Sequence, residues 1–89
     1  MGMEFELLRN EKGGYNKESF LVKLDAYTDL INAMQNGMPV EEAKAELEQI
    51  HQLPLHREKG GFFGKEGFSV KDTDAYIADL EKGIAKAFK

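Results

Sequence analysis

The stretch that decides the fold is Gly-Tyr-Asn-Lys-Glu-Ser-Phe at residues 14–20, which has a counterpart in Gly-Phe-Ser-Val-Lys-Asp-Thr at residues 67–73. Each stretch runs from a glycine through an aromatic residue to a side chain that commonly caps helices, and polar residues follow. An Asp-Ala-Tyr tripeptide comes later in each half, although the first copy has four more residues before it. We therefore predict a divergent internal repeat over residues 5–36 and 55–88.

The first copy opens a helix that we expect over residues 16–36. Asn16 is a suitable N-cap, and Tyr15 before it is placed to pack on Phe20 as a hydrophobic staple. Gly37 is expected to end the helix. The apolar residues alternate at spacings of four and three, which is typical of a coiled-coil stripe. This stripe consists of Phe20, Leu24, Tyr27, Ile31 and Met34.

Two further helices are expected. The second runs from Pro39 to about His51, because proline suits the first helical position. The third begins at Ser69, where Asp72 completes an approximate capping box. Its stripe again alternates at spacings of three and four and includes Ile77, Leu80 and Ile84. The predicted fold class is mainly α, with three helices forming a helical hairpin and a coiled-coil-like bundle.

Short extended segments are expected before the first and third helices. They cover residues 3–8 and 55–63, and each precedes one of the two glycine-aromatic pairs. A turn is expected after the first segment, at residues 10–14. Phe5 and Leu7 alternate in the first segment, so both side chains would lie on one face of a strand. We predict that the two segments pair as a short β-ribbon, although glycines interrupt the second one.

Size and composition limit the class of protein. A chain of 89 residues is expected to form one small domain over residues 1–89, and such a core supplies only about 3–5 kcal/mol of stability. The absence of cysteine excludes disulfides and thiolate metal sites. A net charge of -4 argues against a general nucleic-acid binder. No segment approaches the ~20 apolar residues of a membrane span, so we expect a cytoplasmic protein.

The segment at residues 62–80 resembles the amino-terminal motif of the DivIVA family of bacterial cell-division and polarity scaffold proteins. It reads Phe-Phe-Gly-Lys-Glu-Gly-Phe-Ser-Val-Lys-Asp-Thr-Asp-Ala-Tyr-Ile-Ala-Asp-Leu. Gly67 and Phe68 match the Gly-Tyr pair of the family, and Ile77 and Leu80 match its coiled-coil positions. Residues 14–20 look like a second, more divergent copy. The two copies cover about half of the chain, and the resemblance implies a self-associating scaffold.

The chain departs from the family pattern because it has two copies of the motif, an intervening helix and no long coiled coil. The resemblance also implies membrane targeting by an exposed aromatic residue among basic ones. The alternative is that one or both of the aromatic rings cover the end of the helical core, and we favour it because aromatic residues dominate small cores. Membrane attachment through so few groups would be weak. The candidate residues are Arg57, Lys59, Phe62, Phe63 and Lys65.

Few residues suggest chemistry. His51 and His56 lie five residues apart across Pro54, which matches no established metal-ligand spacing. The acidic residues at the expected helix starts complement the helix dipole, which is simpler than an acid-base role. Residues 60–65 superficially suggest a phosphate loop but lack its spacing and its Ser or Thr. We predict a non-enzyme without metal or cofactor.

Two functions from different classes remain. The first is an assembly or adaptor module that forms a homo-oligomer, most simply a homodimer, peripheral to the inner face of the cell membrane or free in the cytoplasm, with room for another protein partner. The second is a small helical domain that binds a ligand or peptide between its helices. The residues expected at the oligomer interface are Phe20, Leu24, Tyr27, Ile31, Met34, Ile77, Leu80 and Ile84.

Overall fold

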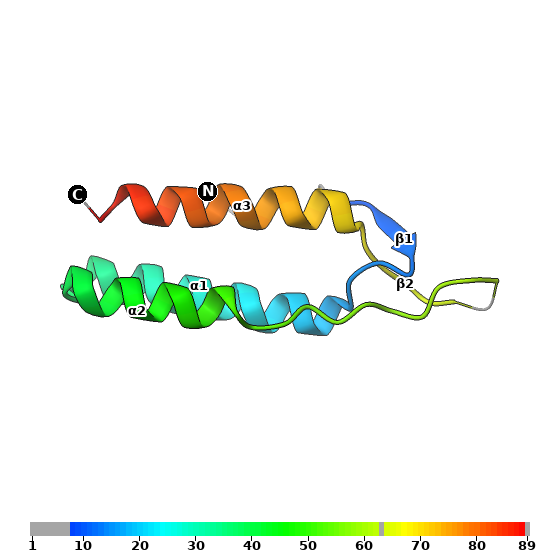
Figure 1. The fold of residues 1–89 in the computed structure, drawn as a ribbon, viewed down its shortest axis with the longest axis horizontal. Helices are drawn as coiled ribbons and strands as arrows, with labels where there is room; N and C mark the ends of the chain where they lie inside the picture. Colours follow the sequence, from blue (N-terminus) through cyan, green and yellow to red (C-terminus); the bar gives the residue numbers. More distant parts are fainter. Residues whose placement is uncertain (1–7, 63, 89) are drawn as a thin grey trace.

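The structure of the chain, a computed structural model, describes residues 8–62 and 64–88. Its elements follow the order β1 (Asn10–Lys12), α1 (Lys17–Gln35), α2 (Val40–His51), β2 (Glu66–Phe68) and α3 (Val70–Lys86). Helices α1 and α3 leave the ribbon in the same direction, and α2 returns antiparallel to α1 (Figure 1). The prediction of a mainly α fold with three helices and a short antiparallel ribbon is confirmed.

The helix boundaries follow local signals in the sequence. The side chain of Asn16 caps α1 by accepting a hydrogen bond from the Ser19 N–H at 2.8 Å. Ser69 caps α3 in the same way. Helix α1 ends beside Gly37, whose φ of +100° lies in the left-handed region that favours glycine. Pro39 is the N-cap of α2 and so lies one position before the place predicted for it.

The ribbon lies later in the chain than predicted. Strand β1 falls in the turn expected after residues 3–8, and β2 follows the segment at residues 55–63. The reason is that glycines make the second segment fold back on itself, and the Lys65 N–H donates to the Lys59 carbonyl at 3.0 Å. Residues 3–7, which include Phe5 and Leu7, lie outside the described residues.

The two glycine-aromatic pairs meet backbone to backbone at the base of the helices. Tyr15 and Phe68 exchange hydrogen bonds, with N–H to carbonyl distances of 2.8 and 2.9 Å. A Cβ added to Gly67 would lie 2.1 Å from the Tyr15 carbonyl oxygen, and one added to Gly14 would lie 2.4 Å from that of Phe68. Each copy therefore needs its glycine because the aromatic residue of the other copy lies against it.

The core has two parts. Near the ribbon, Leu8, Phe20 and Leu24 are buried together. The Phe20 ring packs edge-on against Phe68 and Tyr76, with centroid distances of 5.2 and 6.0 Å, so it contacts aromatic residues of the other copy. Further along, the three helices enclose a second cluster made by Tyr27, Leu30, Ala43, Ile50 and Ile84.

Candidate functional site

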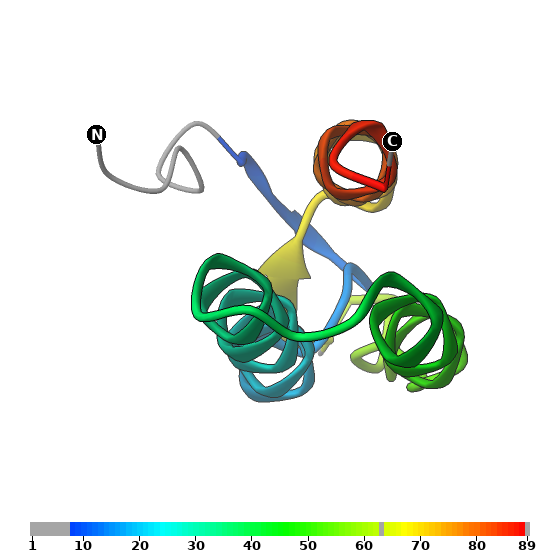
Figure 2. The ribbon, with the colours of Figure 1, turned by 90° about the vertical axis from the view of Figure 1, so that its left-hand side faces the viewer.

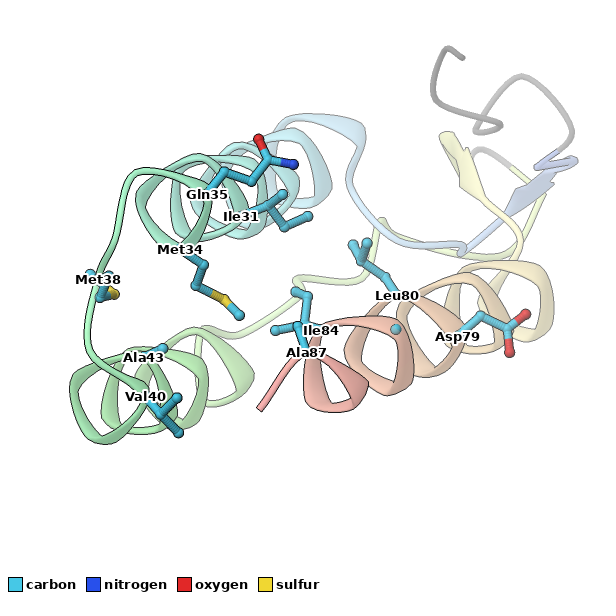
Figure 3. Close-up of a pocket in the computed structure, with 11 residues that line it drawn as sticks. Ile31, Met34, Gln35, Met38, Val40, Ala43, Asp79, Leu80, Ile84 and Ala87 are labelled. Carbon is cyan, nitrogen blue, oxygen red and sulfur yellow. The ribbon is translucent and has the colours of Figure 1, made fainter. Parts of the chain in front are cut away.

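An apolar groove opens between the three helices at the end of the bundle away from the ribbon (Figure 3). Its volume is about 530 Å³, which is within the range of ligand and peptide pockets. Gln35 and Asp79 are the residues with polar side chains among those that line it. Its apolar lining includes Ile31, Met34, Met38, Val40, Leu80 and Ile84.

Small residues keep the groove open. Gly83 and Ala87 face it from α3, and Ala43 faces it from α2. A Cβ built on Gly83 would have no atom within 4 Å, so the space beside this turn of α3 is unfilled. Glycine inside a helix costs about 1 kcal/mol relative to alanine. The sequence thus places a destabilising residue where it leaves an apolar surface uncovered.

A polar cluster joins the three helices next to the groove. The Tyr27 hydroxyl of α1 donates to the Glu81 carboxylate of α3. His51 at the end of α2 lies with Nδ1 2.9 Å from the same carboxylate. Burial alone raises the pKa of Glu81, but the hydrogen bonds from Tyr27 and His51 outweigh it, so the pKa is lowered overall. Burial and the bond to Glu81 raise the pKa of Tyr27.

Lys23 is a buried cation that fastens α2 to α1. Its side chain is on the apolar face of α1, and the residue is only 5% exposed. The ammonium donates to the carbonyl oxygens of Ile50, His51 and Leu53 at 2.8–3.0 Å, where the helix dipole of α2 favours a positive charge. Burial lowers the pKa of Lys23. Lys23 was not predicted from the sequence. Its spacing of three and four residues from Phe20 and Tyr27 is the signal that places it on the apolar face.

The residues predicted for the oligomer interface differ in how far their own chain buries them. Phe20, Leu24, Tyr27 and Ile84 are buried within a single chain, because the three helices and the ribbon cover them. Ile77 is half-buried and packs against both parts of the core. The remaining residues, Ile31, Met34 and Leu80, line the groove together with Ile84. Most residues of the apolar stripes therefore pack in the core of a single chain. The part of the stripes that a partner can still contact is the groove.

A second candidate surface lies at the opposite end of the molecule. The chain between α2 and β2 runs beyond the ribbon and turns back at a tip (Figure 1). Phe62 at this tip is 85% exposed. Phe62 therefore does not cover the helical core, because the glycine-rich turn carries it away from the helices. The favoured interpretation, in which one or both rings cover the end of the core, then rests on Phe63. Phe63 lies outside the described residues.

Cations surround the tip, although not all of those predicted are available. Lys59 and Lys65 are exposed at its base. The Arg57 side chain is held at the ribbon, because its Nε donates a hydrogen bond to the Gly13 carbonyl. Lys12 of β1 was not predicted, yet its ammonium donates to the Phe62 carbonyl at 3.1 Å and lies 5.9 Å from the centre of the ring. Its position in a turn-prone segment gave no signal of this contact.

The acidic residue Asp72 at the start of α3 and His51 at the end of α2 have structural partners. Arg9 binds the Asp72 carboxylate through Nε and Nη2 at 2.9 and 3.0 Å. These hydrogen bonds lower the pKa of Asp72 to about 2. Within residues 8–62 and 64–88, no three or more acidic or histidine side chains gather as metal ligands. None of the helices described is both long and apolar enough to cross a bilayer.

Comparison of the chain with protein-family models, curated proteins and solved structures gave no match. Its function is therefore inferred from the groove, the tip and the helix packing.

Proposed function

We propose that the chain is a non-enzymatic assembly module of DivIVA-like type, which associates with further copies of itself through the apolar groove. The observation that carries this proposal is a groove formed by all three helices and left open at one end of the bundle (Figure 3). A core this small gains stability when another chain covers such a surface.

The surface area of the chain supports association. The accessible surface is 6111 Å², whereas a compact monomer of 10.0 kDa exposes about 5,200 Å². The chain therefore exposes about 900 Å² more surface than a compact monomer of its mass. The radius of gyration is also large, at 14.4 Å against about 12 Å for a compact domain of this length.

The contacts of the polar residues support a non-enzymatic role. His51 and Tyr27 share Glu81, Tyr15 donates to Asp74 at 2.8 Å, and Lys23 is held by carbonyl groups. Each of these bonds joins separate parts of the chain and so stabilises the fold. The groove itself is lined mainly by hydrocarbon, which favours apolar packing over acid-base or nucleophilic chemistry.

Two exposed valines provide a matched test. Val40 lines the groove, whereas Val22 lies on α1 outside it, and both are exposed. Val40→Glu adds a charge to the groove. The new carboxylate lies at the start of α2, where the helix dipole tolerates a negative charge. We expect sedimentation velocity to show self-association for the unaltered chain and for Val22→Glu, with a much weaker association for Val40→Glu.

Sedimentation velocity also distinguishes self-association from the alternative function, which is binding of a ligand or peptide. A chain that stays monomeric at every concentration while its groove takes up a helical peptide would be a ligand- or peptide-binding domain. Circular dichroism of each variant should match that of the unaltered chain, so that loss of association is not confused with unfolding.

A membrane contact at the tip is a second candidate function, and the 85% exposure of Phe62 favours it. An apolar ring with nearby Lys59 and Lys65 could enter the headgroup region of an anionic bilayer. The net charge of -4 opposes this attraction, so binding is expected to be weak and sensitive to salt. Co-sedimentation with anionic vesicles, with Phe62→Ser as the variant and Val22→Ser as the control, tests the contact.

A further inference from the structure

The groove and the tip lie at opposite ends of an elongated molecule. The chain extends 48 Å along its longest axis and only 24 and 16 Å across it. The groove lies where α1 ends, α2 begins and α3 ends, and Figure 2 looks along the axis from that end. The tip of the chain between α2 and β2 projects past the ribbon at the other end (Figure 1). A single chain therefore cannot place its own tip in its own groove.

The two ends are complementary in shape and polarity. Phe62 is a large apolar side chain on a narrow turn, with small glycines at positions 60, 61 and 64 beside it. The groove offers about 530 Å³ between apolar side chains, which is ample for one aromatic ring. Met34 and Met38 contribute to its lining, and flexible thioether side chains adapt well to an inserted ring.

The charges around the two ends also differ. Lys12, Lys59 and Lys65 surround the tip, and all three are exposed. Asp79 lines the groove, and Glu41 and Glu42 lie in the first turn of α2 beside it. Lys82 and Lys86 of α3 offset part of this negative charge. Glu58 and Glu66 lie beside these lysines in the sequence and offset part of the positive charge at the tip. Charge therefore contributes little to the approach of the two ends, and the apolar contact supplies most of the affinity.

We propose that Phe62 of one copy inserts into the groove of the next copy, so that the chains join head to tail. This inference rests on the proposed self-association and names the segment that fills the groove. A contact between two different surfaces at opposite ends cannot close a homodimer, and it generates an open series of subunits where the rotation between successive copies closes no ring. The assembly is then a filament of variable length in place of the homodimer that the helical stripes predicted.

Two complementary variants test this arrangement. Phe62→Ser removes the inserted ring and leaves the groove, whereas Val40→Glu charges the groove and leaves the tip. The weight-average mass of the unaltered chain should rise continuously with concentration in sedimentation velocity. Loss of an aromatic side chain at the centre of an interface is expected to weaken association by about 30-fold or more. Each variant alone should therefore be largely monomeric, and Val22→Ser should behave like the unaltered chain.

An equal mixture of the two variants gives the decisive result. The intact tip of Val40→Glu can enter the intact groove of Phe62→Ser, and the blocked ends stop further growth. We expect complexes of two chains whose mass reaches a plateau. Met34→Glu charges the groove from α1, and we expect the same outcome when it is used in place of Val40→Glu. Agreement between the two variants would show that the result does not come from a folding defect in one of them.

The outcomes separate this inference from the proposed function. If Phe62→Ser associates like the unaltered chain while Val40→Glu is monomeric, another segment fills the groove, and the head-to-tail contact is wrong although self-association stands. If the unaltered chain is monomeric throughout, both proposals fail. If Phe62→Ser loses only its binding to anionic vesicles, the tip is a membrane contact and the inserted ring is ruled out.

Discussion

Phe20 and Thr73 occupy the same position in the two copies of the repeat, six residues after Gly14 and Gly67, and both are fully buried. The Phe20 ring packs on Phe68 of the other copy. The Thr73 side chain has no aromatic ring, and its Oγ1 is buried without a hydrogen-bond partner. The two copies therefore differ at this position, with a large aromatic side chain in one and a small polar side chain in the other.

Replacing Thr73 by valine should stabilise the fold. The change keeps the branched shape and removes a buried hydroxyl that has no hydrogen-bond partner. Burying such an unpaired group costs about 1–3 kcal/mol. We expect the free energy of unfolding in urea to rise by about 1 kcal/mol, or the melting temperature by about 4–8 °C. Thr28→Val is the control, because the Thr28 hydroxyl donates to the Leu24 carbonyl and should bring no gain. A lower urea midpoint for Thr73→Val would contradict this explanation.

The glycine of the repeat gives a second prediction. Gly67→Ala would place Cβ 2.1 Å from the Tyr15 carbonyl oxygen, so the two hydrogen-bonded backbones must separate. We expect a loss of stability of about 3 kcal/mol or more, as for other overpacked sites. Gly83→Ala has open space and improves helix propensity, so it should gain about 1 kcal/mol. Equal effects of the two substitutions in thermal unfolding would show that close backbone approach is not the reason for Gly67.

How much of this could be read from the sequence depends on the range of each interaction. The caps Asn16 and Ser69 were predicted because a cap and its partner are three residues apart. The place of β1 was missed because residues 10–12 pair with residues 66–68, and no local pattern specifies a partner so distant. The segment at residues 55–63 is predicted to be extended, and residues 56–58 do pair with residues 14–16. The glycines that follow them turn the rest of the segment into a tip.

The repeat shows the same limit. Its helix starts are in register, since Tyr15 pairs with Phe68. Counting from this pair, Tyr27 corresponds to Leu80 and Tyr76 to Lys23. The two Asp-Ala-Tyr tripeptides thus lie at different levels of the bundle. Among the residues of the candidate site, the groove residues that belong to the helical stripes were predicted from the sequence. The exposure of Phe62 was not predicted, because it depends on the direction of a loop, and composition does not determine that direction.

The buried Lys23 supports a third prediction. Lys23→Met keeps most of the aliphatic stem and removes the ammonium, which leaves the carbonyl oxygens of Ile50, His51 and Leu53 without this donor. We expect a loss of about 2–3 kcal/mol in the free energy of unfolding, because unsatisfied buried groups are costly. Hydrogen exchange should locate the loss at the end of α2. Lys44→Met on the exposed face of α2 is the control, and an equal loss there would argue against a special role for Lys23.

The ion pair between Arg9 and Asp72 predicts how stability changes in acid. The side-chain hydrogen bonds from Arg9 lower the pKa of Asp72 from 3.8 to about 2 in the folded chain. A carboxylate with a lowered pKa stabilises the fold above its unfolded pKa, and the contribution is lost as the pH falls through the folded value. Urea unfolding measured from pH 5 to pH 2 should therefore show stability decreasing most steeply between about pH 4 and pH 2. Asp72→Asn should flatten this part of the profile, and Arg9→Gln should flatten it similarly because the lowered pKa depends on that guanidinium. The double variant should resemble either single one, since both remove the same pair. A steep decrease that persists unchanged in Asp72→Asn would assign the acid sensitivity to other carboxylates.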